Sequence, residues 1–385
     1  MRGDDLGLPP VSARAAIVHD WLPLIGGAER VVADMVRTCP NSEIFTTFDF
    51  LTDEERAEVA LGVPVRASGL NKLPFLKRYY RNLLPACTRA IEAFDVTNHD
   101  VVLSSSAAFA KGVITSPEQV HIAYVHSPAR YAWDMSHSYI SAMGGLLGPL
   151  KRAIAKRMMH NFRMWDTRTA AGVDHFVANS EFIARRIKKV YRREAQVLYP
   201  PVDTRNFKMG GAKEDVYLTA SRMVPYKNVP MIVAAFNERP NLKLRVLGDG
   251  PDMARVQALA GPNIEVLGHV DTEQMRKEMQ QAKAFVFAAK EDFGIVPVEA
   301  QACGTPVIAL DAGGTAETVR PLGDTAPTGV WFNEQTREAL LAAIDTFEAE
   351  GHTIRADDCR ANALRFSAER FRGELRNLIF DTAGL

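Results

Sequence analysis

Cysteine is scarce in this chain of 385 residues, and its few cysteines are widely spaced. No C-x-x-C pair occurs, so neither a disulfide framework nor a zinc site of the usual spacing is indicated. The four cysteines are Cys39, Cys87, Cys303 and Cys359. We expect them to be reduced, mostly buried thiols of a cytosolic protein.

Long hydrophobic runs are also missing. No segment reaches the roughly 18 consecutive apolar residues that a membrane-spanning helix needs. The N-terminal stretch MRGDDLGLPP contains no apolar leader segment. The sequence therefore predicts a protein that is neither secreted nor membrane-spanning.

An excess of charge of one sign is absent as well, because 46 basic residues balance 46 acidic ones. Residues 1–200 contain 25 Lys and Arg against 20 Asp and Glu, which leaves 21 against 26 in the remainder. Such a small surplus argues against a nucleic-acid partner. A content of 47% hydrophobic and 24% charged residues is ordinary for a globular enzyme, and the length suits two domains.

Short apolar runs rich in β-branched residues alternate with helix-length amphipathic segments along the chain. This alternation is typical of α/β domains, in which helices cover parallel sheets and functional groups collect at the carboxyl ends of the strands. We expect strands at residues 15–20, 43–48, 101–106, 120–127 and 175–180, and then at 216–221, 242–248, 264–268, 284–289 and 306–310.

A segment rich in proline and glycine, LYPPVDTRNFKMGGAKED, separates the two sets of strands and indicates a linker near residues 200–214. We therefore expect one Rossmann-like domain over residues 1–200 and a second over 201–365. The amphipathic pattern of residues 366–385 predicts a C-terminal helix that packs back on the first domain.

Two glutamates, Glu291 and Glu299, stand eight positions apart in the segment EDFGIVPVEAQACGTPVIAL, directly after an expected strand. Pro297 suits the first turn of a helix and Gly304 its end, which places Glu299 in the first turn. Gly294 lets the backbone approach a ligand closely, and a helix N-terminus attracts anions. Acidic residues at a helix start can also merely complement its dipole. The whole segment favours a site for an anionic, hydroxyl-rich ligand.

Three further motifs follow expected strands. In SRMVPYKN, Arg222 and Lys227 can converge on one anionic group, although two solvated surface cations are an equal alternative. Gly26 and Gly27 precede an expected helix in HDWLPLIGGAERVV, which alone usually marks a turn. His126 lies in YVHSPARYAWD, where a lone histidine is more often structural. G-x-G-x-x-G is absent after the first strand, so a dehydrogenase fingerprint is not supported.

Together these motifs resemble those of the retaining glycosyltransferases of family 4, which have the GT-B fold of two doubly wound Rossmann-like domains facing across a cleft. The spacing from Glu291 to Glu299 matches the donor-binding motif of that family, and Arg222 and Lys227 match its R-x-x-x-x-K element. The H-S-P-x-R-Y-x-W and H-D-W-L-x-x-x-G-G-A-E runs are most similar to those of bacterial exopolysaccharide α-mannosyltransferases that act on diphosphopolyprenol-linked cellobiose. The resemblance covers residues from about 15 to 320.

For the second domain, the resemblance implies that a nucleotide-sugar donor is bound there. Glu299 would bind the ribose hydroxyls of the nucleotide, and Arg222 and Lys227 would neutralise the diphosphate as it leaves. The transferred sugar would be held by Glu291 and by the backbone of Phe293, Gly294 and Ile295.

For the first domain, the resemblance places Gly26 and Gly27 near the donor phosphate and the acceptor. His126 would hydrogen-bond a donor hydroxyl or support the transition state, and with Glu291 it forms the expected catalytic pair. No two aspartates stand two positions apart, so no D-x-D motif can bridge a metal to the diphosphate. We expect no metal and no cofactor beyond the nucleotide sugar, and a glycosidase-type carboxylate pair is not supported.

Two segments are basic without any acidic residue. Residues 59–91 contain six basic residues interleaved with leucines and aromatics, and residues 151–163 add five more. An anionic bilayer surface attracts such segments, although a solvated helix face with an apolar core side gives a similar pattern. We expect the membrane and acceptor contact at Lys72, Lys77, Arg78, Tyr79, Tyr80 and Arg81.

These observations lead to one hypothesis of function. The protein would transfer mannose from GDP-mannose, with retention, to a polyprenyl-diphosphate-linked oligosaccharide at the cytoplasmic face of the cell membrane. The alternatives are a glucosyl- or N-acetylglucosaminyltransferase that uses a UDP-sugar, a sugar-nucleotide epimerase on the same fold, and a non-catalytic nucleotide-sugar-binding or membrane-binding module. The intact set of Arg222, Lys227, Glu291 and Glu299 disfavours the last.

Overall fold

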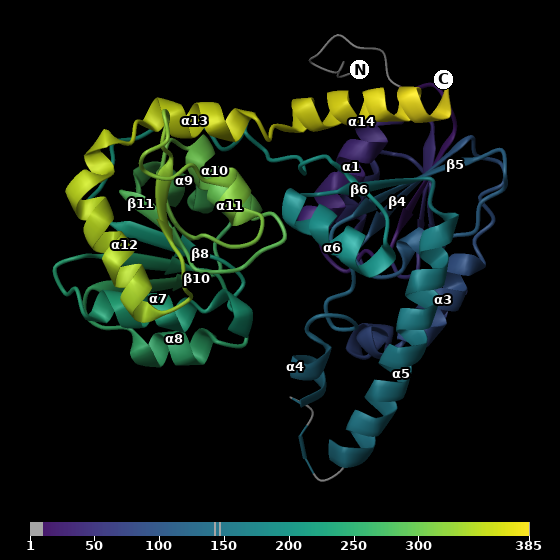
Figure 1. Ribbon diagram of the computed structural model, residues 1–385, viewed down its shortest axis with the longest axis horizontal. Helices are drawn as coiled ribbons and strands as arrows, with labels where there is room; N and C mark the ends of the chain where they lie inside the picture. Colours follow the sequence, from purple (N-terminus) through teal and green to yellow (C-terminus); the bar gives the residue numbers. More distant parts are fainter. Residues whose placement is uncertain (1–10, 142–143, 146–147, 385) are drawn as a thin grey trace. The chain divides into compact units, whose positions relative to one another are not determined.

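The structure is a computed structural model that describes residues 11–141, 144–145 and 148–384 (Figure 1). The N-terminal stretch in which no leader segment is expected lies outside the described residues. The chain divides into two compact units. Unit 1 runs to Tyr199 and resumes at Phe371, and unit 2 comprises Pro200–Arg370.

Unit 1 is built on a parallel sheet of seven strands in the order β3-β2-β1-β4-β5-β6-β7. The central strands are apolar and buried on both faces, as parallel strands covered by helices must be. The strands are β1 (Ala15–His19), β2 (Ser42–Thr46), β3 (Val65–Ala67), β4 (Val101–Ser106), β5 (Val120–Val125), β6 (His175–Ala178) and β7 (Gln196–Val197).

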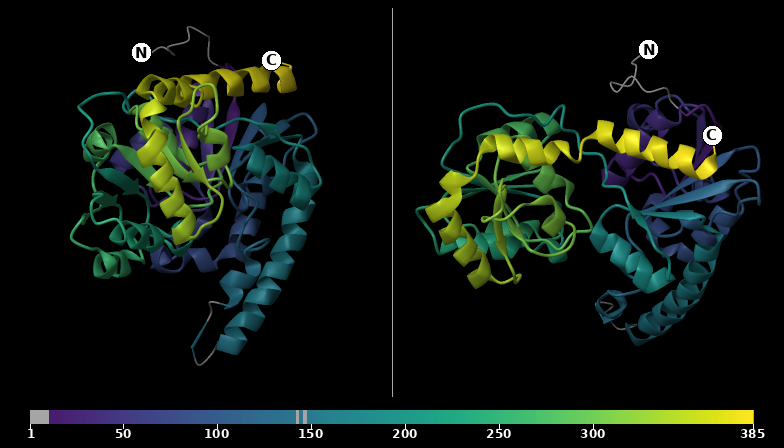
Figure 2. Two further views of the ribbon diagram at one scale, coloured as in Figure 1. Left: turned by 60° about the vertical axis from the view of Figure 1, so that its left-hand side comes forward. Right: turned by 45° about the horizontal axis from the view of Figure 1, so that its top comes forward.

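The helices of unit 1 cover this sheet, and one of them comes from the far end of the chain. Phe371, Leu375 and Ile379 of α14 (Ala368–Ala383) are buried in the same cluster as Ile17 of β1, and both views of Figure 2 show α14 in yellow over this unit. The other helices are α1 (Gly27–Thr38), α2 (Asp53–Ala60), α3 (Leu84–Glu92), α4 (Ser136–Ser141), α5 (Gly148–Thr169) and α6 (Glu181–Tyr191), with 3-10 turns at Gly69–Lys72, Leu76–Arg78, Tyr80–Asn82, Ala110–Gly112 and Ala170–Gly172.

Unit 2 has a parallel sheet of six strands in the order β10-β9-β8-β11-β12-β13. The strands are β8 (Tyr217–Ala220), β9 (Leu244–Leu247), β10 (Ile264–Gly268), β11 (Ala284–Phe287), β12 (Val307–Leu310) and β13 (Gly329–Phe332). The helices are α7 (Val229–Asn237), α8 (Met253–Leu259), α9 (Thr272–Gln281), α10 (Ile295–Ala302), α11 (Thr315–Thr318), α12 (Arg337–Glu350) and α13 (Ala356–Leu364), with 3-10 turns η6 (Pro225–Lys227) and η7 (Gly351–Thr353).

The α/β fold class with two Rossmann-like sheets is confirmed, and all ten expected strands are present. Three further strands, β3, β7 and β13, were not predicted, and each lies at the edge of its sheet. The first two are short and partly exposed, so they lack the continuous apolar run of a central strand. The four cysteines are buried and unpaired, as expected, and burial raises the pKa of Cys39 to about 12.

Each sheet reverses its strand order at one place. In unit 1 the chain passes outward from β1 to β3 and returns with β4 beside β1, and in unit 2 it passes from β8 to β10 and returns with β11 beside β8. The crevice outside the carboxyl ends of the strands at such a point is where α/β sheets bind ligands. Among the described helices, none is both long enough and apolar enough to cross a membrane.

Candidate functional site

An ion pair joins the loops that follow β8 and β11 in unit 2. The Lys227 Nζ lies 3.0 Å from Glu291 Oε1, and the two side chains are only 15% and 18% exposed. The Tyr226 hydroxyl donates to the same carboxylate oxygen over 3.4 Å. Two of the residues expected at the donor site are thus in contact at the point where the strand order reverses.

A glutamine outside every sequence motif fixes these two loops to each other. The Gln335 amide donates to the carbonyl oxygens of Tyr226, at 3.1 Å, and of Ala288, at 2.8 Å. These bonds tie η6 to the end of β11, so the Lys227 ammonium and the Glu291 carboxylate stay close together. Sequence reasoning missed Gln335 because its partners are backbone atoms more than 40 residues away.

A glycine pair after β12 forms the other wall of the Glu291 loop. The Gly314 N–H donates to the Glu291 carbonyl oxygen over 2.9 Å. A Cβ on Gly313, whose φ is +72°, would stand 2.2 Å from that oxygen, and one on Gly314 would stand 2.4 Å from the Asp292 carbonyl oxygen. Only glycine permits this approach. In the sequence, Gly313 and Gly314 form a Gly-Gly pair before the short helix α11, and this pair was not among the predicted site residues.

Helix α10 corrects one expectation about Glu299. The helix begins at Ile295, after Gly294 at a φ of +90°, so Glu299 is its fifth residue and lies in the second turn rather than the first. Pro297 is the third residue of α10 and lies in the first turn, as expected. Glu299 is 5% exposed, and the Phe293 ring packs against Phe366 with centroids 5.4 Å apart. The Phe293 ring is therefore packed inside unit 2 and is not available to a ligand.

Arg222 occupies an exposed position in the loop after β8. Among the described residues it forms no ion pair, so the structure does not bring it to Glu291 as it does Lys227. Its loop is backed by the segment after β9. A Cβ on Gly248 would stand 1.9 Å from the Ser221 carbonyl oxygen, and Met223 N–H donates to the Asp249 carbonyl oxygen over 2.8 Å.

In unit 1 a chain of polar contacts connects His126 to the glycine loop. His126 Nε2 lies 2.8 Å from the Ser105 hydroxyl, which lies 3.1 Å from His19 Nδ1. His19 Nε2 is 3.6 Å from Glu29 Oε1, and Glu29 Oε2 accepts from the Gly26 N–H over 2.9 Å. We call this His126–Ser105–His19–Glu29–Gly26 series the polar chain of unit 1. The structure thus links the predicted residues His126 and Gly26 through three residues that were not predicted, while Gly27 opens α1.

The contacts of His19 show which of its ring nitrogens carries a proton towards Ser105. His19 Nδ1 also lies 3.1 Å from the Ser105 carbonyl oxygen, which can only accept, so Nδ1 carries a proton. The Ser105 hydroxyl lies between His19 Nδ1 and His126 Nε2 and can both accept and donate a hydrogen bond. Burial, together with the neighbouring His19, lowers the pKa of His126 to about 3. His126 is therefore a neutral hydrogen-bond donor at physiological pH.

The other end of the polar chain is a buried histidine–glutamate pair. Burial disfavours the charged form of His19, but Glu29 and Asp20 outweigh it and raise the pKa of His19. Burial likewise opposes ionisation of Glu29, but the contact with His19 more than offsets it and lowers the pKa of Glu29. Both shifts favour the charged forms of the His19–Glu29 pair, which lies beyond Ser105 from His126.

A buried lysine fixes the loop that carries Trp133. Lys111 and Asp166 are 1% and 0% exposed and 2.8 Å apart, and Asp166 also accepts from Trp133 Nε1 over 2.7 Å and from the Tyr191 hydroxyl over 3.1 Å. Burial lowers the pKa of Lys111, partly countered by Asp166. This cluster holds the Trp133 side chain against the interior of unit 1.

The basic segment expected at a membrane lies on the surface of unit 1, but its aromatic residues differ from expectation in their surroundings. The exposed cations are Lys72, Lys77, Arg78 and Arg81. Tyr79 and Tyr80 are half-buried, and the Tyr80 ring packs against Trp21 with centroids 5.2 Å apart. The exposed aromatic is instead Phe75, which is 85% exposed at a φ of +55°.

Among the described residues, no group of three His, Cys, Asp or Glu side chains is arranged to hold a metal ion. The charged groups at the switch point of unit 2 are instead Lys227 and Glu291. Their ammonium can neutralise a phosphate, and their carboxylate can accept from hydroxyl groups.

Two Rossmann-like sheets, each with polar groups at its switch point, define the chain as a protein of the GT-B class, and sequence profiles specify the family. Residues 25–206 match the profile described as "Glycosyltransferase Family 4", and residues 204–366 match "Glycosyl transferases group 1". Because the two matches together span most of the chain, it belongs to the family 4 glycosyltransferases.

Individual relatives are more distant. A GDP-mannose-dependent monoacylated alpha-(1-6)-phosphatidylinositol monomannoside mannosyltransferase of Corynebacterium glutamicum is 35% identical over 119 residues, which are 26% of this chain and only 30% of that enzyme. The alpha-1,3/1,6-mannosyltransferase ALG2 of Kluyveromyces lactis is 23% identical over 96% of this chain and 85% of its own length. The crystal structure of Anabaena HepE in complex with UDP matches with a TM-score of 0.70 at 16% identity, covering 96% of this chain and 100% of HepE.

Proposed function

We propose that the protein is a retaining glycosyltransferase that moves mannose from GDP-mannose to a polyprenyl-diphosphate-linked oligosaccharide. The observation that carries the proposal is the Lys227–Glu291 pair at the switch point of unit 2, with Glu299 behind it on α10. The choice of mannose is supported by two relatives that are named mannosyltransferases.

Each group of the proposed donor site has a chemical task. Lys227 and Arg222 neutralise the diphosphate while the bond between its oxygen and the anomeric carbon breaks. Glu291 accepts hydrogen bonds from the sugar hydroxyls, and Glu299 accepts from the ribose. The acceptor hydroxyl attacks from the face that the diphosphate leaves and gives its proton to a diphosphate oxygen, so no protein nucleophile and no metal are required.

In unit 1 the proposal assigns His126 to the reacting sugar. Its neutral ring can donate a hydrogen bond, and its Nε2 contacts Ser105, which in turn contacts His19. The exposed cations from Lys72 to Arg81 and the exposed Phe75 suit a peripheral contact with an anionic membrane surface, where a lipid-linked acceptor resides.

The proposal is tested by transfer of radiolabel from GDP-mannose, UDP-glucose and UDP-N-acetylglucosamine into a lipid extract, with EDTA present. We expect label in the lipid phase from GDP-mannose alone, and NMR of the product should show the anomeric configuration of the donor. Label from a UDP-sugar would keep the sites but replace mannose, an outcome in line with the UDP bound in HepE. Donor consumption without any acceptor would instead indicate an epimerase, and an inverted product would exclude the retaining mechanism.

A further inference from the structure

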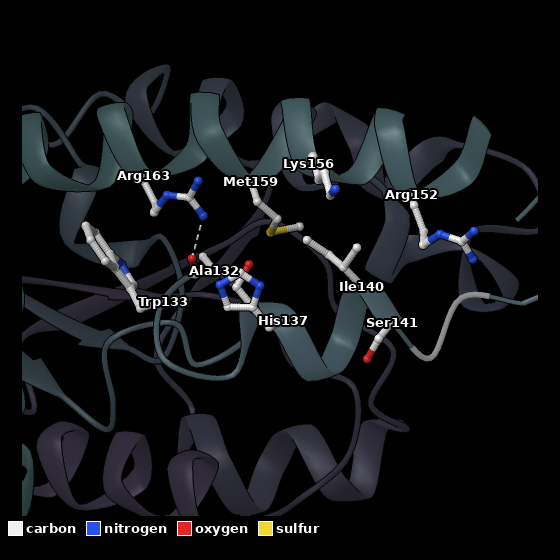
Figure 3. A pocket seen from close by; sticks show the side chains of 10 residues that line it. Ala132, Trp133, His137, Ile140, Ser141, Arg152, Lys156, Met159 and Arg163 are labelled. Carbon is white, nitrogen blue, oxygen red and sulfur yellow. Dashed lines mark hydrogen bonds between the residues drawn. The ribbon is translucent and has the colours of Figure 1, made fainter. Parts of the chain in front are cut away.

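A cavity of about 840 Å³ lies between α4 and α5 of unit 1, away from the strand ends that carry the polar chain. Its volume is within the usual range for small-molecule sites. Figure 3 shows side chains from both helices around it. The lining residues are Ala132, Trp133, Ser136, His137, Ile140, Ser141, Arg152, Lys156, Met159 and Arg163.

The cavity has a strongly basic lining. Arg152, Lys156 and Arg163 are four and seven positions apart on α5, spacings that place them on one helix face, and Figure 3 shows all three beside the space. The ten lining residues include no Asp or Glu. The neighbouring carboxylate, Asp134, is held in a two-pronged ion pair by Arg186, with distances of 2.6 and 2.7 Å. The lining of the cavity therefore presents three cations and contributes no carboxylate of its own.

Arg163 and Lys156 on the basic side of the cavity differ in their contacts with the rest of the protein. Arg163 uses Nη1 to donate to the Ala132 carbonyl oxygen over 2.8 Å, which orients its guanidinium along the cavity. Within the part of the chain that the structure describes, neither Lys156 nor Arg163 forms an ion pair with a carboxylate. Trp133, fixed by Asp166, forms a rigid part of the wall. Arg163 and Trp133 are thus held in place beside a space large enough for a ligand.

Apolar groups accompany the cations. Met159 and Ile140 line the cavity. Leu150 and Ile154 stand two positions before and after the lining residue Arg152 on α5, and they are 58% and 52% exposed. Figure 1 shows α5 extending beyond the sheet of its own unit. A ligand that fits both features has an anionic group joined to an apolar chain.

We propose that this cavity binds the diphosphate of the lipid-linked acceptor, with the first part of its polyprenyl chain against Met159 and Ile140. This inference rests on the proposed function, because it supplies the grip on the acceptor that the donor site in unit 2 does not. Two guanidinium groups and one ammonium suit the multiple oxygens of a diphosphate.

The test measures binding of farnesyl diphosphate to the full chain by calorimetry, with inorganic diphosphate and farnesol as separate probes. We expect farnesyl diphosphate to bind more tightly than either. The double variant Arg152→Ala/Lys156→Ala should weaken this binding by about tenfold or more, because each charge-assisted hydrogen bond contributes about 1.5–3 kcal/mol. The control is Lys151→Ala/Arg157→Ala, which removes equal charge from the same helix at exposed positions that do not line the cavity and should change binding less than twofold.

The outcomes separate this inference from the proposed function. If the control weakens binding as much as the cavity variant, a general surface charge and not the cavity is responsible. If inorganic diphosphate binds as tightly as farnesyl diphosphate, the site takes a free anion and the lipid assignment is overturned. If the cavity variant loses farnesyl diphosphate binding while the wild type transfers no sugar from any donor, the cavity assignment stands and the proposed function fails.

Discussion

The switch points of the two sheets are built from opposite kinds of chemistry. In unit 2 the groups are charged and partly exposed, and Lys227 and Glu291 contact each other directly. In unit 1 His126, whose pKa is lowered to about 3, is neutral at physiological pH, and one serine hydroxyl separates it from the buried His19–Glu29 pair. Under the proposed function, this difference matches the two tasks: unit 2 must neutralise a doubly charged diphosphate, whereas unit 1 must orient an uncharged sugar hydroxyl.

The largest expected effect comes from removing a buried charge from unit 1, which should lower its stability. Lys111→Met leaves the buried Asp166 without its ion-pair partner, which should lower the free energy of unfolding by about 3–5 kcal/mol. Urea unfolding measures the loss. The matched control is Lys188→Met, because Lys188 and Glu194 form an ion pair whose side chains are 66% and 81% exposed. This control should cost about 0.5 kcal/mol or less, and an equal loss in both variants would contradict a special role for burial.

In unit 2 the largest effect should be on activity and not on stability. Under the proposed function, Lys227→Ala removes the ammonium that neutralises the leaving diphosphate, so kcat should fall by about 100-fold. Lys227→Arg should recover part of it, because the positive charge remains. Steady-state kinetics with the donor that passes the transfer assay provides the measurement, and Lys277→Ala on α9 is an exposed control. An unchanged kcat in Lys227→Ala would remove Lys227 from the catalytic site.

Acidic pH should lower the free energy of unfolding of unit 1 because of a further buried histidine, His121. The Ser104 hydroxyl lies 2.8 Å from His121 Nε2, and burial lowers the pKa of His121 from 6.5 to about 4. As the pH falls below 6.5, the unfolded chain binds a proton that the folded chain does not, so stability is lost, by up to about 2 kcal/mol at pH 5.

Hydrogen exchange at pH 7.5 and pH 5 tests this prediction by comparing β5 of unit 1 with β11 of unit 2. We expect β5 to lose more protection, and His121→Gln should flatten its pH dependence even though the variant starts from a lower stability. The same loss in β5 with and without His121 would show that another group causes it.

The smallest effect, and the sharpest test of the polar chain, comes from a pair of neighbouring serines. Ser105→Ala removes the hydroxyl between His126 and His19, and kcat should fall by about tenfold through the loss of roughly one hydrogen bond. Ser104→Ala removes a buried hydroxyl from the same strand, one that contacts His121 instead. The two variants should lose similar stability in urea, and only Ser105→Ala should lower kcat. Equal kinetic effects would mean that Ser105 acts only on the fold.

The two switch points also differ in how far the sequence revealed them. Lys227, Glu291 and Glu299 could be proposed as donor-site residues because their motifs follow expected strands at a characteristic spacing. That spacing is a local property of the sequence. Ser105 and Gln335 were not found, because a serine in a strand and a glutamine before a helix gain their roles only from residues 20 or more positions away.

The fold shows the same division between local and tertiary information. Central strands such as β4 and β11 carry an apolar pattern that does not depend on their neighbours. The edge strand β3 has a valine, an arginine and an alanine, and it is a strand only because the end of β2 offers it a partner. The helical position of Glu299 was missed by one turn, since the start of α10 depends on the left-handed conformation of Gly294.

The return of the chain to unit 1 has a consequence for synthesis. Phe371 and Leu375 complete the core around β1, and Arg372 donates to Asp34 over 2.7 Å, although these residues emerge from the ribosome after all of unit 2. The part of the protein that begins first is therefore finished last, whereas unit 2 is a continuous segment that can fold as soon as it is made. A chain truncated after Arg370 should therefore keep a protease-resistant unit 2, whereas its unit 1 should be incomplete.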